Sequence, residues 1–313
     1  MRPKRQVPDS QRDRPRSASS RNSTRRRGLA YWLGRAWAHW TYARHVEPHW
    51  LEVTRWQLPL ANWPEALDGL RIAHLTDFHV GRRVPLSLLV EAVDLANAQK
   101  PHLIALTGDF VHAGRGYVEQ VAEVLSRLRA PLGVVAVLGN HDFAKRTRLG
   151  WAHSGLPLRI EAALRQRGVR VLRNEAWQVE RNGAAFYVVG VDDLWSGRCD
   201  VQAAFRGIPA QAPCLLLAHH PQTIERLAGH RAILTLSGHT HGGQVNWPGL
   251  GPLFLGGKMR RWATGLFHQR NGWLYVNRGV GYGLRLRYRA RPEVAVFTLL
   301  SRNENRLAHG RHL

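Results

Sequence analysis

The sequence predicts an α/β domain, and three observations support this fold class. Apolar runs rich in β-branched residues, typical of buried strands, alternate along the chain with segments of helical periodicity. Five of these runs end in Asp, Asn or His side chains, which indicates that several strand ends meet at one place. The chain also has 313 residues and 44% hydrophobic content, enough for one large core.

The periodic segments follow one another from residue 51 onwards. In the first half we expect strands and helices in alternation, with strands at 51–60, 70–76, 103–107 and 134–138 and helices at 86–99, 116–129 and 157–167. In the second half we expect mainly strands, at 186–191, 214–218, 232–236, 274–276 and 294–299, with one helix at 223–228. This strand-rich half predicts a second sheet with more antiparallel pairing.

Residues 1–28 form a basic tail that we expect to be disordered. Residues 1–27 hold ten Arg or Lys against two Asp, a net charge of +8, and almost no apolar side chain. Such a segment buries too little apolar surface to offset the entropy of ordering it. A polar tail at 301–313 ends the chain, so the main domain is expected to span 47–300.

Residues 29–46 predict an amphipathic, Trp-rich helix. Apolar residues such as Leu29, Trp32 and Trp40 recur at steps of three and four, and the basic residues lie mostly off this stripe. This pattern suits a helix in a membrane interface, so we expect a peripheral protein, with the cytoplasmic face favoured. One alternative is a helix that docks on its own domain. Another is export, with residues 24–29 as an uncleaved or degenerate twin-arginine-like signal.

The formal net charge is +23, and residues 257–291 contain nine Arg or Lys and no acidic residue. This balance predicts an anionic partner, whether a phosphate compound, an acidic lipid or nucleic acid. The two cysteines, Cys199 and Cys214, exclude a disulfide framework. The sequence contains no run of about 18 apolar residues, which argues against a membrane-spanning helix.

The first two strand ends carry carboxylates. Asp77 and His79 follow the strand at 70–76, and alternate residues of a strand point the same way, so both can reach one ion. Asp109 follows the next strand after Gly108, which permits a tight turn. A carboxylate at this position can bridge two metals through its two oxygens.

The segment Gly139-Asn140-His141-Asp142 is the strongest local signal in the chain. Asn140 offers a neutral oxygen ligand. His141 can reach the substrate, and Asp142 can orient the His141 ring and raise its basicity.

Histidines end two later strands. His219 ends one strand directly and is the preferred ligand there, with His220 as the alternative or as an orienting group. His239 and His241 stand two residues apart, a spacing that lets them face one cluster, one per metal. Carboxylates, imidazoles and an amide together suit two adjacent divalent metals. So many imidazoles disfavour Mg²⁺ and suit Mn²⁺, Fe or Zn²⁺.

This set of motifs resembles the calcineurin-like metallophosphoesterase superfamily. Flanking segments resemble its bacterial YaeI/YkuE-like phosphodiesterase branch, and they lie at 46–50, 84–88, 193–197, 239–244, 282–285 and 291–294. The resemblance spans roughly residues 47–300, and no ligand of the family pattern is missing. It implies a four-layer α/β/β/α sandwich with the metals at the strand ends.

The resemblance also implies a role for each residue of the motifs. It gives one metal to Asp77, His79 and His241, the other to Asn140, His219 and His239, and the bridging position to Asp109. It makes His141 the acid that protonates the leaving group, backed by Asp142.

The expected function is therefore that of a dinuclear-metal-dependent phosphoester hydrolase. The favoured form is a membrane-associated phosphodiesterase or pyrophosphatase acting on an amphiphilic or lipid-linked phosphate, such as a UDP-2,3-diacylglucosamine-like compound. Residues 242–261 are apolar and rich in Gly and Pro, and we expect them near the site with Arg285 and Arg287 as substrate contacts. The alternatives are a nuclease with the same metal centre, or a non-catalytic envelope-binding module. We expect a monomer.

Overall fold

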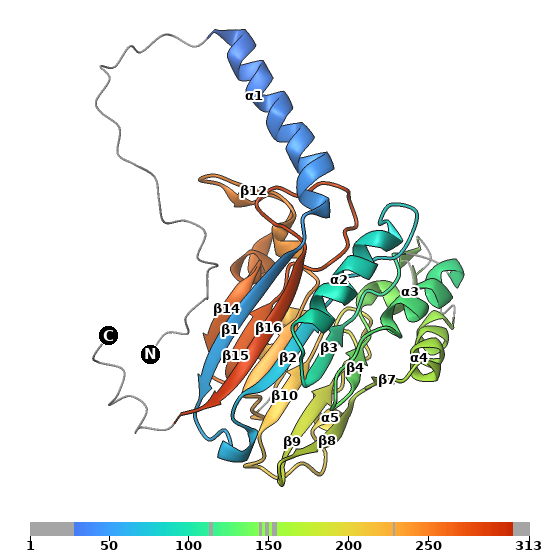
Figure 1. Cartoon of the computed structure of the whole chain (residues 1–313), viewed down its shortest axis with the longest axis vertical. Helices are drawn as coiled ribbons and strands as arrows, with labels where there is room; N and C mark the ends of the chain where they lie inside the picture. The colour runs from blue at the N-terminus through green and yellow to red at the C-terminus, as the bar shows by residue number, and fades with distance from the viewer. Residues whose placement is uncertain are drawn as a thin grey trace, which may run out of the picture.

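Two six-stranded sheets pack face to face, and helices cover their outer faces (Figure 1). The computed structural model describes residues 28–112, 115–143, 146–147, 150–151, 155–227 and 229–302. The basic tail expected at 1–28 and the polar tail expected at 301–313 lie outside these residues, apart from Gly28, Ser301 and Arg302.

The first sheet has the strand order β1-β16-β2-β3-β4-β7. Its strands are β1 (Glu52–Leu60), β16 (Glu293–Ser301), β2 (Leu70–Leu75), β3 (Leu103–Thr107), β4 (Val134–Val137) and β7 (Val169–Val171). All neighbours are parallel except β16 and β2. Because β2, β3 and β4 run in the same direction, the loops that follow them leave the sheet at the same edge.

The second sheet has the order β14-β15-β11-β10-β9-β8. Its strands are β14 (Gly265–Gln269), β15 (Gly272–Val276), β11 (Leu234–Ser237), β10 (Cys214–Leu217), β9 (Ala184–Gly190) and β8 (Glu175–Arg181). The expected antiparallel pairing occurs only at its edges, between β14 and β15 and between β8 and β9. The central pairs are parallel, so β10 and β11 end side by side.

The helices complete a four-layer α/β/β/α sandwich. Helices α2 (Leu86–Ala98), α3 (Val118–Leu125) and α4 (Leu156–Gln166) cover the outer face of the first sheet (Figure 1). The outer face of the second sheet has a thinner cover, made by α5 (Val201–Ala204) and by 3₁₀ helices at Pro221–Arg226 and Gly257–Trp262. The helix expected at 223–228 is the first of these 3₁₀ helices, and it begins at Pro221.

Helix α1 (Leu29–Thr41) extends away from the sandwich (Figure 1), and none of its residues is buried. It continues as a π-helix at Tyr42–Val46 and a 3₁₀ helix at Glu47–His49. Further short elements are 3₁₀ helices at Glu65–Leu67, Arg115–Tyr117, Asn140–Phe143 and His241–Gly243, and the strand pairs β12 (Asn246–Trp247) with β13 (Gly251–Pro252) and β5 (Arg146–Thr147) with β6 (Gly150–Trp151). Among the described helices, none combines the length and apolar character needed to cross a bilayer.

Candidate metal centre

The predicted ligands meet where five strands end. Asp77 and His79 follow β2, Asp109 follows β3, and Asn140 follows β4 in the first sheet. The second sheet contributes His219 after β10 and both His239 and His241 after β11. Each sheet therefore supplies one wall of the centre.

Three side chains form a first group. Nε2 of His79 lies 3.0 Å from Nε2 of His241, which in turn lies 3.3 Å from Oδ1 of Asp77. The third separation, from His79 Nε2 to Asp77 Oδ1, is 3.8 Å. Asp77 and His79 are buried, whereas His241 is partly exposed.

Three other side chains form a second group around the amide oxygen of Asn140. Oδ1 of Asn140 lies 2.9 Å from Nδ1 of His239 and 3.1 Å from Nε2 of His219. The two imidazole nitrogens are 3.3 Å apart. Nδ1 of His219 donates to the main-chain carbonyl of Thr107 at 2.6 Å, so Nε2 is the ring nitrogen that faces the group.

Asp109 lies between the two groups. Its Oδ2 is 3.4 Å from Nε2 of His79 in the first group and 3.3 Å from Nε2 of His219 in the second. Its Oδ1 accepts the main-chain N–H of His141 at 2.9 Å. Oδ2 thus faces both groups while Oδ1 accepts a main-chain N–H, and the bridging of two metals by Asp109 stays a prediction.

These separations fit two metal ions. Ligand atoms that bind one ion at about 2.0–2.2 Å stand about 3 Å apart, because the angles between them are near 90–110°. Within the two groups, the ligand atoms are 2.9 to 3.8 Å apart. The first group offers two imidazoles and a carboxylate, the second offers two imidazoles and an amide oxygen, and Asp109 faces both, so the residues present suit Mn²⁺, Fe or Zn²⁺.

Burial and the charges of neighbouring ligands shift the pKa values of side chains in the centre. Burial alone would raise the pKa of Asp109, but His219 and His79 outweigh this effect and hold that pKa well below its usual value. Burial would lower the pKa of His219, yet Asp109 and Asp77 raise it to about 10. Burial lowers the pKa of His241 to about 3, so its ring is neutral and offers a lone pair.

The backbone at the ligands is unusual. Asp77, His79, Asp109, His239 and His241 all have φ between 47° and 71°, the left-handed region that side chains other than Gly seldom adopt. The residues at i and i+2 therefore face one cluster through tight turns beyond the strand ends, and the side-chain alternation expected of a strand is not the cause. Such strain persists only where the surrounding structure enforces it, and it gathers at functional sites.

Asp142 has a different role from the one expected. Its Oδ2 accepts the N–H groups of Asp109 and Gly139, each at 2.9 Å. Its Oδ1 accepts those of Phe110 at 2.9 Å and Val111 at 3.4 Å. The carboxylate therefore fixes the loop that carries Asp109. The expected support of the His141 ring by Asp142 is wrong, because both carboxylate oxygens bind main-chain amides.

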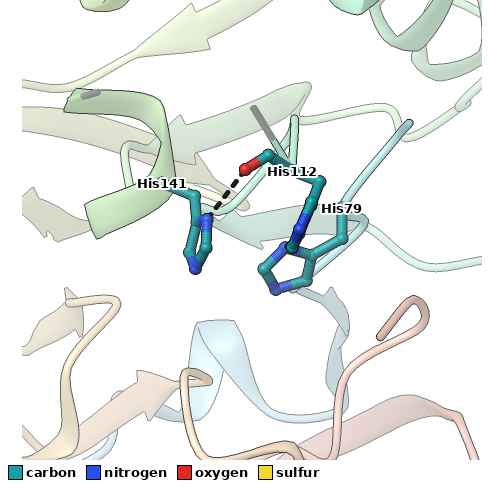
Figure 2. Close-up of side chains that lie close together, drawn as sticks. All are labelled: His79, His112 and His141. Carbon is teal, nitrogen blue, oxygen red and sulfur yellow. Dashed lines mark hydrogen bonds between the residues drawn. The ribbon is translucent and has the colours of Figure 1, made fainter. Parts of the chain in front are cut away.

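The ring of His141 is held by His112, a residue that the sequence analysis did not single out. Figure 2 shows the bond from Nδ1 of His141 to the main-chain oxygen of His112, which is 2.9 Å long. The His112 ring stacks on that of His141 at 5.3 Å between centroids and also lies beside His79. The one sequence signal for His112 is its position three residues after Asp109, and that signal is weak.

The two arginines expected to contact substrate differ in exposure. Arg287 is fully buried, and its terminal nitrogens donate to the main-chain carbonyls of Arg278, Gly279, Gly281 and Ala290. Its guanidinium is thus committed to the loop next to Asp77, and a substrate contact would require these bonds to break. Arg285 is partly exposed, and its charge acts on His49 and Tyr282.

At β10 the structure directs His219, and not His220, towards the second group. Nδ1 of His220 accepts the N–H of Gln222 and caps the 3₁₀ helix at Pro221–Arg226. Its ring contacts those of His239, at 4.4 Å, and Trp195, at 4.9 Å between centroids. Trp195 itself contacts His239 at 4.4 Å between centroids.

A family profile and individual relatives both relate this chain to enzymes that cleave phosphate ester or anhydride bonds. The calcineurin-like phosphoesterase family profile matches residues 70–243. Phosphodiesterase YaeI of Escherichia coli is 36% identical, over 83% of this chain and 92% of its own length. Metallophosphoesterase YkuE of Bacillus subtilis is 31% identical, over 84% of this chain and 90% of its own length. The UDP-2,3-diacylglucosamine pyrophosphatase LpxG of Chlamydia trachomatis is 30% identical, over 83% of this chain and 93% of its own length.

Proposed function

This chain belongs to the calcineurin-like phosphoesterase family, and we propose from that premise that it hydrolyses phosphodiester or pyrophosphate bonds of lipid-linked substrates at a membrane surface. It is a metal-dependent phosphoesterase, and the family uses a dinuclear divalent metal centre. The observation that carries the proposal is the position of Asp109 Oδ2, which is 3.3 to 3.4 Å from a ligand nitrogen in each of two groups.

In this proposal each group holds one divalent ion. The first ion would be bound by Asp77, His79 and His241. The second would be bound by Asn140, His219 and His239. Asp109 would bind both ions. When bound, the ions neutralise charge on the phosphate oxygens and supply a water of lowered pKa. Asn140, His141, His239 and His241 are partly exposed, so the substrate approaches from their side.

His141 is the proposed proton donor. Its Nδ1 bonds the carbonyl of His112, so Nε2 is the atom that gives a proton to the leaving oxygen. Proton donation of this kind contributes about 10²–10⁴-fold to a hydrolysis rate. The bond to a main-chain oxygen also fixes the direction in which the ring points.

The substrate class comes from the relatives. LpxG of Chlamydia trachomatis is a UDP-2,3-diacylglucosamine pyrophosphatase and YaeI is a phosphodiesterase. Both activities cleave a bond at a phosphorus that is linked through oxygen on two sides, and we extend this feature to the substrate of this chain. From LpxG we also extend the acylated sugar that is attached to the phosphate.

Support for a membrane contact comes from α1. Leu29, Trp32, Leu33, Trp37 and Trp40 are each more than half exposed, and the helix buries no residue. Its contact with the domain lies near its end, where Nδ1 of His39 is 3.3 Å from the Tyr288 hydroxyl. A helix docked on its own domain would bury one face, so these exposures favour a bilayer interface as the partner.

The loop around β12 and β13 adds to this surface. Trp247 lies 6.4 Å from His39 of α1 between ring centroids, so the two segments are adjacent. Trp247, Leu250, Leu253 and Phe254 are all exposed. Lys258, Arg260 and Arg261 follow in the chain, and cationic side chains beside apolar ones suit a surface that contains anionic lipid.

The catalytic part of the proposal is tested with bis(4-nitrophenyl) phosphate and 4-nitrophenyl phosphate, each with added Mn²⁺ and with EDTA. We expect Mn²⁺-dependent cleavage that is faster for the diester. Cleavage of the monoester alone, or activity that survives EDTA and dialysis, would contradict it. Hydrolysis of a diacylated UDP-sugar then tests the substrate class.

The membrane part is tested by flotation with liposomes that contain phosphatidylglycerol. We expect the full chain to float and a Trp32→Ser/Trp37→Ser variant to remain in the lower fractions. Equal flotation of both proteins would contradict the role of α1. Cleavage of single-stranded oligonucleotides at a rate above that of the lipid-linked substrate would favour a nuclease instead.

A further inference from the structure

Trp195 is a large aromatic side chain that remains 51% exposed beside a proposed metal ligand. Its ring meets that of His239 edge to face, at 4.4 Å between centroids and 84° between planes. It also contacts His220 at 4.9 Å and 50°. The two imidazoles fix the position of the indole while half of its surface stays open to solvent.

The turn that carries Trp195 is well ordered by its own hydrogen bonds. Oδ2 of the buried Asp193 accepts the N–H of Ser196 at 2.8 Å, and the Ser196 hydroxyl donates to the Asp193 carbonyl at 2.6 Å. These bonds hold residues 193–196 in one conformation. Trp195 therefore does not need to be ordered when a ligand arrives, which lowers the entropic cost of binding.

We infer that Trp195 is a stacking platform for a planar heterocyclic group of the substrate, that is, for the base of a nucleotide whose phosphate occupies the metal centre. This inference deepens the proposed function and rests on it. A fixed indole with an exposed surface matches the π-face that every nucleobase presents. Its contact with His239 sets it directly beside the second ligand group, so a base stacked there remains attached to a phosphate at the metals.

Isothermal titration of the Mn²⁺-loaded protein with UMP and with ribose 5-phosphate tests the inference. The two ligands differ only at C1 of the ribose, where UMP carries the base and ribose 5-phosphate a hydroxyl, so the ratio of their Kd values reports what the base contributes. We expect wild type to bind UMP more tightly, and Trp195→Leu to weaken UMP binding by roughly 5- to 160-fold, the range for loss of one base–aromatic stack. The Kd for ribose 5-phosphate should change less than about twofold, and Trp195→Phe should retain most of the preference for UMP.

Trp50→Leu is the matched control, because Trp50 is 48% exposed and the 3₁₀ helix that precedes it is outside the metal centre. It should leave both Kd values unchanged. Bound manganese is measured in every variant, since an equal loss of affinity for both ligands would mean that Trp195 acts by supporting His239 and would overturn the inference. Equal binding of UMP and ribose 5-phosphate by wild type would overturn it as well.

A lipid-binding role for Trp195 is distinguished by a third ligand, dioctanoyl phosphatidic acid below its critical micelle concentration. If Trp195→Leu weakened binding of this lipid and not of UMP, the platform would serve acyl chains and the inference would be wrong. Failure of the proposed function has a separate signature: wild type would then bind UMP through Trp195 yet show no Mn²⁺-dependent diester cleavage.

Discussion

The carboxylate of Asp142 accepts the main-chain N–H of Asp109 at 2.9 Å, and it also accepts three neighbouring N–H groups. Asp142 therefore positions the bridging carboxylate. An Asn at this position has one acceptor oxygen, and its NH₂ group would face main-chain donors. We expect Asp142→Asn to lower affinity for Mn²⁺ by about 10- to 100-fold, the range for residues that orient metal ligands. Titration calorimetry of the metal-free protein measures this directly.

The control for this prediction is His141→Gln, which should bind Mn²⁺ with wild-type affinity. The alternative role of Asp142, as a partner of the His141 ring, predicts the reverse pattern. In that case Asp142→Asn would keep its metals and lose turnover to the same extent as His141→Gln.

The loss of turnover in His141→Gln should depend on the leaving group. A 4-nitrophenolate leaves without a proton, so the variant should cleave bis(4-nitrophenyl) phosphate at close to the wild-type rate. An alkoxide needs protonation, so cleavage of an alkyl diester should fall by about 10²–10⁴-fold. Steady-state kinetics with both substrates at saturating Mn²⁺ checks this. A similar loss for the two substrates would rule out His141 as the acid.

The dependence of the rate on pH tests the role of His141 as the general acid in a second way. Burial lowers the pKa of its ring below the usual 6.5, and a general acid must be protonated to act. The rate of alkyl diester cleavage should therefore decline as pH rises through that lowered pKa. His141→Gln should lack this decline, whereas the profile for bis(4-nitrophenyl) phosphate should be the same in both proteins.

Sequence patterns predicted which segments meet, because each ligand motif follows an apolar run and parallel strands end at a common edge. They did not predict hydrogen-bond partners. Asp142 is adjacent to His141 in the chain, yet it bonds amides from another loop, and the His141 ring is held by a main-chain atom of His112. A main-chain acceptor leaves no residue-type signal in the sequence.

Three other features could not be predicted from the sequence, for physical reasons. β8 has a single buried residue, Val179, and no regular alternation, and β7 has three residues, so neither gives a clear strand signal. The left-handed conformation of Asp77 and His241 is disfavoured locally and results from tertiary contacts. The full burial of Arg287 is equally unexpected, since Arg is rarely buried unless its donors are satisfied.

Metal binding should release a proton from His219. Asp109 and Asp77 raise the pKa of this residue to about 10 against the effect of burial, so its ring is protonated at neutral pH until a cation replaces the proton. We expect about one proton released per protein, and a metal affinity that rises about tenfold per pH unit near neutrality. Calorimetry in two buffers with different ionisation enthalpies counts the protons. Heats that do not depend on the buffer would contradict this assignment.

The close approach of Gly238 to Asp77 gives the last prediction. A Cβ atom at Gly238 would collide with the Asp77 carboxylate and the Thr76 side chain, so Gly238→Ala must displace Asp77. We expect loss of the first metal group and a free energy of unfolding about 1–3 kcal/mol lower, as for other overpacked sites. Bound manganese per chain and thermal unfolding with EDTA measure the two effects separately. Gly116→Ala is the control, because no atom lies within 4 Å of its added Cβ, and it should keep both metals. Two ions bound with wild-type affinity in Gly238→Ala would show that Asp77 can shift without loss of the site.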